Sequence, residues 1–263
     1  MSTEDVYIPY HEPGTITMLA GPCSVEGTSM FDEVASMLAD EGLHWIRGGA
    51  FKPRTSPYSF QGMGMEGVQI MHDAGEKYGL NALTEVVDTK HVAAVAELVD
   101  GLQIGTRNMS NFELLKVIGK VTEESHKCIL FKRGMAATVD EMLSAVEYIT
   151  QYGNPNVMLC ERGIRTFETS SRFTLDITAV PVVHQRSTFP ICVDVSHPAG
   201  QTALVGPLAK AAVAAGADSL MIEVHPDPKV AKSDAAQQLT LPQFQELLGE
   251  LREIAAAVGK RIV

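Results

Sequence analysis

Short apolar runs alternate along the chain with longer segments in which apolar residues recur at helical spacing. The runs are candidate strands, and they lie at 16–21, 44–48, 81–85, 102–105, 128–132, 157–161, 191–195 and 219–224. The helical patterns after them predict helices near 28–41, 65–78, 88–99, 110–119, 138–152, 167–178, 201–215 and 240–258. Eight strand–helix units in 263 residues are typical of a closed (β/α)8 barrel, because an open doubly wound sheet of this length usually has fewer strands.

The alternation is not interrupted by a Ser/Gly-rich linker or a block of charge. We therefore expect a single α/β domain, a TIM barrel over 16–263, preceded by an N-terminal extension over 1–15. The first residues, MSTEDVYIPYHEPG, are polar and acidic, and no apolar run approaches the roughly 20 residues of a membrane span. The sequence thus predicts a soluble, cytoplasmic protein.

Polar and charged residues gather just after the apolar runs, which is where the active-site loops of such a barrel lie. In chain order they are Cys23, Arg47, Lys52, Arg54, Glu85, Arg107, Lys132, Arg162, Arg165, Asp194, His197, Glu223 and His225. Cations dominate the second, fourth, fifth and sixth of these strand ends. A single Arg is readily explained by a surface salt bridge, but repetition at four strand ends favours a shared site for an oxyanion-rich ligand.

The segment RGGAFKPRTSPYSFQGMG at 47–64 concentrates three of these cations among small, turn-forming residues. The chain as a whole is acidic, with 32 Asp and Glu against 21 Lys and Arg and a net charge of −11. This balance argues against nucleic-acid or anionic-membrane partners, which are attracted by clustered Lys and Arg. Local positive charge in an acidic chain instead suggests a grip on a small phosphorylated molecule.

A second group combines Cys23, His197, Glu223 and Asp234, from the first, seventh and eighth strand ends, which become neighbours when a barrel closes. Mixed sulfur, nitrogen and oxygen donors suit Zn, Fe, Mn or Co better than Ca or structural Mg. The spacing is not a motif by itself. Each residue also has an ordinary structural explanation, as a turn residue, a cap before Pro198, a buried ion-pair partner and a helix cap respectively. From the residues alone, both interpretations remain open.

Other patterns have little functional content. Cys128, Cys160 and Cys192 border apolar runs and are best explained as small core residues, so disulfides are not expected. The segment GMGMEG lacks the preceding strand and the later acidic residue of a dinucleotide fingerprint, and neither a GxSxG nor a Walker pattern occurs.

Eight ordered motifs together resemble the 3-deoxy-D-arabino-heptulosonate 7-phosphate synthases, and specifically their compact type I-beta branch, which is related to the 3-deoxy-D-manno-octulosonate 8-phosphate synthases. The resemblance runs from about residue 16 to the C-terminus. The motifs are AGPCSVEG (20–27), RGGAFKPRTSPYSFQGMG (47–64), IGTRNM (104–109), LFKRGM (130–135), LCERGIRTFE (159–168), VDVSHPAGQ (193–201), IEVHPDP (222–228) and SDAAQQL (233–239). The family implies a (β/α)8 barrel that condenses phosphoenolpyruvate with erythrose 4-phosphate in the first step of the shikimate pathway.

The resemblance also implies roles for individual residues. The positions that match the family's divalent-metal ligands are Cys23, His197, Glu223 and Asp234. Those that match its phosphoenolpyruvate-binding groups are Arg47, Lys52, Arg107, Lys132 and Arg162. Arg54 and Thr55 match the residues that receive the phosphorylated aldose. The octulosonate branch typically has KANRS where this chain has KPRTS, so the resemblance favours erythrose 4-phosphate over arabinose 5-phosphate.

The implied chemistry is consistent with these residues. A divalent cation can polarise the aldehyde oxygen while the enol carbon attacks, after which water adds at C2 and phosphate is lost. Lys52, between the two substrate sites, is the candidate proton shuttle, whereas Arg107, Lys132 and Arg162 orient and neutralise the phosphate. His197 is expected to act as a ligand and not as a base.

The resemblance further implies a homo-oligomer, a dimer or a tetramer. Many relatives carry an extra regulatory module, whereas only about 15 residues precede the first predicted strand here. We therefore expect no inhibition by aromatic amino acids through this chain, although a separate chorismate mutase could still regulate it. Two alternatives remain: an octulosonate synthase, and a catalytically silent barrel that serves as a regulatory or scaffold subunit.

Overall fold

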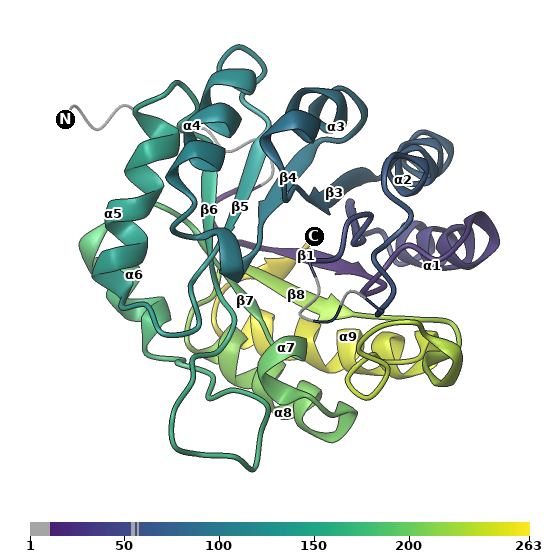
Figure 1. Ribbon diagram of the computed structural model, residues 1–263. Helices are drawn as coiled ribbons and strands as arrows, with labels where there is room; N and C mark the ends of the chain where they lie inside the picture. Colours follow the sequence, from purple (N-terminus) through teal and green to yellow (C-terminus); the bar gives the residue numbers. More distant parts are fainter. Residues whose placement is uncertain (1–10, 54–55, 57) are drawn as a thin grey trace.

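The computed structural model describes residues 11–53, 56 and 58–263, so the predicted aldose-binding residues Arg54 and Thr55 lie outside the described residues. Its parallel strands follow the order β2-β3-β4-β5-β6-β7-β8-β1, and a further pairing of β1 with β2 closes the barrel. The strands are β1 (Thr15–Gly21), β2 (Trp45–Arg47), β3 (Asn81–Glu85), β4 (Gly101–Ile104), β5 (Cys128–Lys132), β6 (Val157–Glu161), β7 (Ile191–Asp194) and β8 (Ser219–Glu223). Figure 1 shows this barrel surrounded by helices, which confirms the predicted fold.

Most predicted helices are confirmed to within about two residues. The α-helices are α1 (Thr28–Asp40), α2 (Met65–Tyr78), α3 (Val92–Leu98), α4 (Phe112–Val121), α5 (Val139–Thr150), α6 (Ala179–Arg186), α7 (Ser196–Ala199), α8 (Thr202–Ala214) and α9 (Leu241–Ala257). Short 3-10 turns, η1 (Thr89–His91), η2 (Thr106–Asn108) and η3 (Pro228–Val230), lie in the loops. The predicted helix 88–99 is thus a 3-10 turn followed by a short α-helix.

The predicted helix at 167–178 is wrong, because the helix after β6 begins only at Ala179. The preceding residues instead form the long loop at the lower left of Figure 1. Ile164 and Thr174 form an antiparallel bridge, and the Glu168 carboxylate accepts hydrogen bonds from the backbone N–H groups of Thr169 and Ser170, each at 2.7 Å. Such side-chain bonds to nearby backbone compete with helical ones, which explains why this polar segment forms a loop.

A further strand, β9 (Arg261–Ile262), was not predicted from the sequence. It pairs in parallel with Thr15 and Ile16 at the start of β1, at the end of the barrel away from the carboxyl ends of the strands. Two residues are too few for a recognisable alternation, which is why the pattern gave no sign of it.

The barrel interior contains a separate small core. It consists of Leu19, Trp45, Leu83, Cys128, Leu130, Met158, Cys160, Cys192 and Met221. A larger cluster fills the space between the strands and the helices. The four cysteines are buried and unpaired, and Cys128, Cys160 and Cys192 are core residues, as predicted for these three. In the part of the chain that the structure describes, no helix is long and apolar enough to cross a membrane.

Side chains two positions apart on a strand point to the same side of the sheet. On the interior side of the barrel, they change from apolar to charged toward the carboxyl ends of the strands. Four site residues each lie two positions after a residue of the small core: Arg47 after Trp45, Lys132 after Leu130, Asp194 after Cys192 and Glu223 after Met221. The site residues are therefore aimed inward at the carboxyl ends of the strands, where TIM-barrel active sites lie.

Candidate active site

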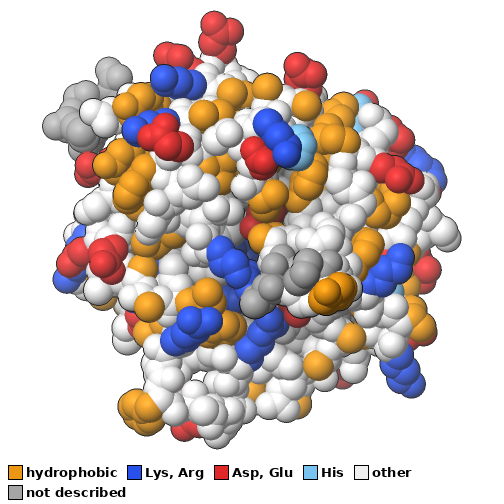
Figure 2. Space-filling model, in the orientation of Figure 1, with side chains coloured by type: hydrophobic (Ala, Val, Ile, Leu, Met, Phe, Trp, Pro, Cys, Tyr) orange, Lys and Arg blue, Asp and Glu red, His pale blue; other side chains and the backbone are white. Residues whose placement is uncertain are grey.

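A cavity of about 350 Å³ opens at the carboxyl ends of the strands. Its lining includes all five predicted phosphoenolpyruvate-binding residues and one further cation, namely Arg47, Lys52, Arg107, Lys132, Arg162 and Arg172. In Figure 2, Lys and Arg side chains gather near the middle of the face that shows this end of the barrel. The chain is acidic overall, so the positive charge gathered in this cavity is a local exception. It makes the cavity attractive to anions.

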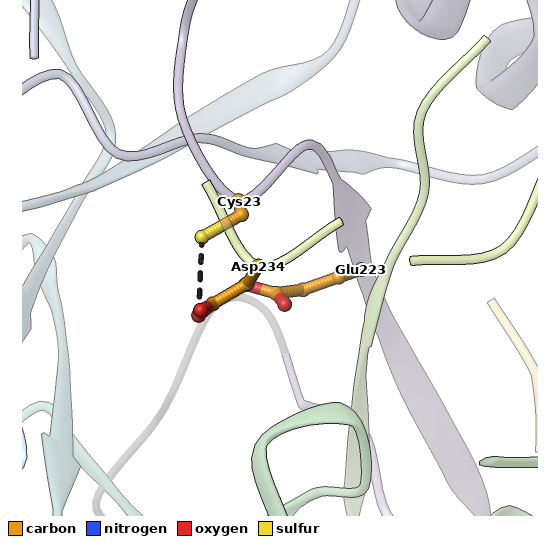
Figure 3. A group of neighbouring side chains, drawn as sticks. All are labelled: Cys23, Glu223 and Asp234. Carbon is orange, nitrogen blue, oxygen red and sulfur yellow. Dashed lines mark hydrogen bonds between the residues drawn. The ribbon is translucent and has the colours of Figure 1, made fainter. Parts of the chain in front are cut away.

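Three of the four predicted metal ligands form a compact group. One donor atom each from Cys23, Glu223 and Asp234 lies within 4.8 Å of the others. Figure 3 shows Cys23 facing Asp234, with its Sγ 3.5 Å from Oδ2 of the carboxylate. The loop after β1, the end of β8 and the loop after β8 supply the three side chains. Segments far apart in sequence therefore converge on one point beside the cavity.

His197, the fourth predicted ligand, adjoins two members of this group. Its Nε2 lies 3.6 Å from Oε1 of Glu223 and 3.8 Å from Oδ2 of Asp234. The imidazole comes from α7, directly after β7, and lines the cavity. One thiol, one imidazole and two carboxylates thus share a small volume, which is a donor set that suits a first-row transition metal.

The protonation states of this group fit a cation. Burial, reinforced by the Glu223 charge, raises the pKa of Cys23 to about 12. Burial would also raise the pKa of Asp234, but His197, Arg172 and Lys52 outweigh it and lower that pKa to about 2. The site therefore holds ionised carboxylates beside a thiol that ionises only if positive charge is added. A bound divalent metal would supply that charge, because a coordinating thiol loses its proton.

Two of the cavity cations also contact the group of predicted metal ligands. The Lys52 Nζ donates to Cys23 O at 2.8 Å and to Cys23 Sγ at 3.0 Å. Arg47 Nη1 donates to the carbonyl of Pro22 at 2.7 Å and to Glu223 Oε1 at 3.3 Å. A Cβ at Gly49 would lie 2.7 Å from both Cys23 O and Lys52 Cδ, so only glycine leaves room for this approach.

Asp194 contacts one of the cavity cations, Lys132, and one of the predicted metal ligands, His197. Its Oδ2 accepts a hydrogen bond from Lys132 Nζ at 2.6 Å and lies 2.7 Å from His197 Nδ1, in a contact whose angle departs from that of a good hydrogen bond. Burial would raise the pKa of Asp194, yet His197 and Lys132 outweigh it, and the pKa lies well below its usual range. Asp194 is therefore a buried carboxylate that stays ionised.

Comparisons with known proteins show the family of this chain. A model of the DAHP synthetase I family matches residues 12–258. The chain belongs to this family. A phospho-2-dehydro-3-deoxyheptonate aldolase of Thermotoga maritima is 47% identical over 249 residues, which make up 95% of this chain and 72% of that protein. A 2-dehydro-3-deoxyphosphooctonate aldolase of Rhodopseudomonas palustris is 31% identical over 264 residues, covering 94% of this chain and 90% of its own length.

Solved structures of the DAHP synthetase I family superpose on the whole barrel. The crystal structure of phospho-2-dehydro-3-deoxyheptonate aldolase (DAHP synthase) from T. maritima gives a TM-score of 0.91 at 45% identity, covering 96% of this chain and 72% of that one. A truncated form of 3-deoxy-D-arabino-heptulosonate 7-phosphate synthase from T. maritima gives 0.89 at 41% identity, covering 100% and 94%. The family resemblance stated from the sequence motifs is thereby confirmed.

In this member of the DAHP synthetase I family, sequence reasoning missed one cavity cation. Arg172 Nη1 lies 3.2 Å from Oδ1 of Asp234 and donates to Gln237 Oε1 at 2.8 Å. Gln237 in turn donates to Glu223 Oε2 at 2.6 Å. The incorrect helix at 167–178 hid Arg172, although its position in the loop after the sixth strand, like that of Arg162, could have indicated it.

Two strand-end residues singled out from the sequence lie elsewhere among the described residues. Arg165 is exposed, and its backbone N–H bonds the carbonyl of Met135. His225 is buried, with Nδ1 accepting a hydrogen bond from the backbone of Asp227 and Nε2 3.9 Å from Oε2 of Glu26. Both belong to loop packing beside the cavity instead of to its lining.

Proposed function

We propose that this DAHP synthetase I family member is a 3-deoxy-D-arabino-heptulosonate 7-phosphate synthase. It condenses phosphoenolpyruvate with erythrose 4-phosphate, releases phosphate and opens the shikimate pathway. One observation carries the proposal: a cluster of cations lines a single cavity together with His197 and Asp234, and the Cys23 thiol and Glu223 carboxylate lie directly beside these two residues. A phosphorylated enol and an aldehyde that must be polarised need these two kinds of site side by side.

We assign the binding of phosphoenolpyruvate to Arg47, Lys52, Arg107, Lys132 and Arg162. Arginine offers a planar fork to phosphate or carboxylate oxygens, and lysine adds a point charge. Lys132 and Arg162 are almost fully buried, and the Arg162 guanidinium stacks 4.2 Å above the Phe173 ring. These cations hold the phosphate in a fixed orientation and compensate its charge as the reaction proceeds.

Cys23, His197, Glu223 and Asp234 would hold the divalent metal, for which Mn, Zn, Fe and Co all suit the donor set. When bound, such an ion acts as a Lewis acid on the aldehyde oxygen of the aldose. His197 presents Nε2 to the two carboxylates and is not a general base. The protein's own role here is to bring four side chains from three strand ends to one point.

Lys52 is our candidate for proton transfer. The enol carbon attacks the aldehyde carbon, so a carbon–carbon bond forms, the aldehyde oxygen gains negative charge and C2 of the former enol becomes cationic. Lys52 delivers the proton that the alkoxide takes up, because its ammonium lines the cavity beside the metal-ligand group. Water then adds at C2 and gives up a proton that restores the Lys52 ammonium, and the carbon–oxygen bond to phosphate breaks as the hemiketal collapses to the ketone.

Erythrose 4-phosphate is the proposed aldose, received by Arg54 and Thr55. The observation that supports it is the intact KPRTS segment, together with 47% identity to a heptulosonate aldolase against 31% to an octulosonate aldolase. Phosphate release with each sugar at matched concentrations tests this choice. Preference for arabinose 5-phosphate would make the protein an octulosonate synthase, and no turnover with either sugar would favour the silent barrel.

The metal requirement has its own test. Treatment with a chelator should abolish turnover, and adding back Mn²⁺, Zn²⁺, Fe²⁺ or Co²⁺ one at a time should restore it to different extents. Turnover that is insensitive to the chelator would contradict the proposal. From the family resemblance alone, we also propose a homo-oligomer, a cytoplasmic location and regulation, if any, through a separate chorismate mutase.

A further inference from the structure

Asp194 is a charged residue to which the proposed reaction assigns no role. It ends β7, and its side chain is fully buried. Lys132 and His197, which it contacts, both line the cavity. Asp194 therefore reaches the reacting region only through two other side chains. One of them belongs to the proposed phosphate-binding group and the other to the proposed metal ligands.

The contacts of Asp194 use both of its oxygens. Oδ1 accepts a hydrogen bond from the backbone N–H of His197 at 3.1 Å, which anchors the start of α7. Oδ2 accepts from Lys132 Nζ at 2.6 Å and lies 2.7 Å from His197 Nδ1. One carboxylate thus holds the backbone and ring of a histidine and the ammonium of a lysine from another strand.

This arrangement restricts both partners. Nδ1 of His197 lies 2.7 Å from the Asp194 carboxylate, and the opposite side of the ring then presents Nε2 to Glu223 and Asp234. Outer partners of this kind fix the tautomer and the ring orientation of metal-binding histidines. The Lys132 side chain would otherwise sample several rotamers, and the ion pair fixes its ammonium in one place.

We propose that Asp194 is a positioning residue that couples the phosphate-binding half of the site to the metal-binding half. The inference rests on the proposed function, because it takes Lys132 as a phosphoenolpyruvate contact and His197 as a ligand. Moving one carboxylate then disturbs both subsites at once, so metal and phosphoenolpyruvate each bind better when the other is present.

The competing explanation is that Asp194 only neutralises a buried lysine. Asp218 provides a matched control, because it also joins a lysine and a histidine. Lys260 Nζ donates to its Oδ1 at 3.0 Å, and His184 Nε2 lies 2.7 Å from its Oδ2. Asp218 precedes β8, at the opposite end of the barrel from the cavity. Asp218→Asn should therefore lower stability without touching either subsite.

The experiment compares Asp194→Asn and Asp218→Asn by calorimetric titration. Mn²⁺ is titrated into the metal-free protein, and phosphoenolpyruvate is titrated with and without saturating Mn²⁺. We expect Asp194→Asn to weaken metal binding by about 10-fold or more, as losing an outer partner of a metal ligand does. Phosphoenolpyruvate affinity should fall as well, and the mutual enhancement should disappear. Asp218→Asn should leave all three quantities within about two-fold of the wild type, at a comparable loss of melting temperature.

The proposal would be overturned by wild-type affinities in Asp194→Asn, and equally by losses in Asp218→Asn as large as those in Asp194→Asn. A measurement on the wild type guards against a variant that does not fold. In the wild type, Mn²⁺ should bind more tightly with saturating phosphoenolpyruvate than without it, and equal Mn²⁺ affinities would refute the coupling. Failure of the proposed function is distinguishable, because it would show as absent phosphate release by the wild type while these binding measurements still report on Asp194.

Discussion

The ammonium of Lys52 donates a hydrogen bond to Sγ of Cys23 at 3.0 Å. A proposed phosphoenolpyruvate contact therefore touches a proposed metal ligand, just as Arg47 touches Glu223. The two subsites share a boundary made of charged side chains, without an apolar wall between them. A substitution in one subsite should therefore alter binding in the other.

Replacing Cys23 with Ala should remove the sulfur ligand. We expect metal affinity to fall by at least about 100-fold, the upper end of what losing a mere outer partner costs. Loading with Co²⁺ gives a direct readout, because thiolate ligation produces an intense near-ultraviolet absorption that the variant should lack. Cys128→Ala, in the apolar core of the barrel, is the control and should keep the band and the activity. Full activity in Cys23→Ala would refute the assignment.

Gly49→Ala should impair catalysis more than folding. The added Cβ would lie 2.7 Å from Cδ of Lys52 and from the carbonyl of Cys23, so the lysine must move. A displacement of about 1 Å can cost about 100-fold in rate, and we expect kcat to fall by that order. The control is Gly249→Ala in α9, where nothing lies within 4 Å of the new Cβ. It should keep full activity and gain up to about 1 kcal/mol in stability.

Arg172→Gln should weaken the site modestly. The residue pairs with Asp234 at 3.2 Å, but its side chain is 41% exposed, so solvent screens the interaction. We expect catalytic efficiency and metal affinity each to fall by about three- to five-fold. Arg252→Gln is the matched control, since Arg252 pairs with Glu41 at 3.0 Å and is 44% exposed far from the cavity. If both variants behave alike in steady-state kinetics, Arg172 has no part in the site.

The stability contribution of Asp218 should depend on pH. Burial would raise its pKa, but the Ile191 N–H, His184 and Lys260 outweigh burial and lower it below the ordinary 3.8. The folded state therefore binds fewer protons than the unfolded state, and the contribution is present above pH 3.8 and lost as pH falls through the lowered pKa. Asp218→Asn should cost about 2 kcal/mol at pH 7.

Urea unfolding of the wild type and Asp218→Asn across a pH series measures this difference. The gap between the two proteins should close as the pH falls below about 4, because the wild-type carboxylate then takes up its proton. A gap that stays constant or widens on acidification would contradict the assigned ion pairs.

The strand–helix alternation was enough to predict the barrel, because each strand is a short apolar run and most helices have a clear apolar stripe. It failed at 167–178, where the Glu168 carboxylate accepts hydrogen bonds from the backbone N–H groups of Thr169 and Ser170 and so competes with the helix. That error concealed Arg172. The motifs predicted metal ligands and phosphate contacts, but they carry no information on which side chains meet. The link from Lys132 through Asp194 to His197 joins residues up to 65 positions apart and emerges only when β5 and β7 lie in one barrel.

Inward-facing side chains change from apolar to charged between one inward-facing position and the next on the same strand, as from Leu130 to Lys132 or from Met221 to Glu223. The distance spanned is only about 7 Å along each strand. The charged cavity thus has an apolar floor, which keeps water away from the charges on that side. Water therefore screens the attraction between the cations and an incoming phosphate less than it would on an open surface, so the attraction is stronger. The field of the cations directs the phosphate inward along the barrel axis.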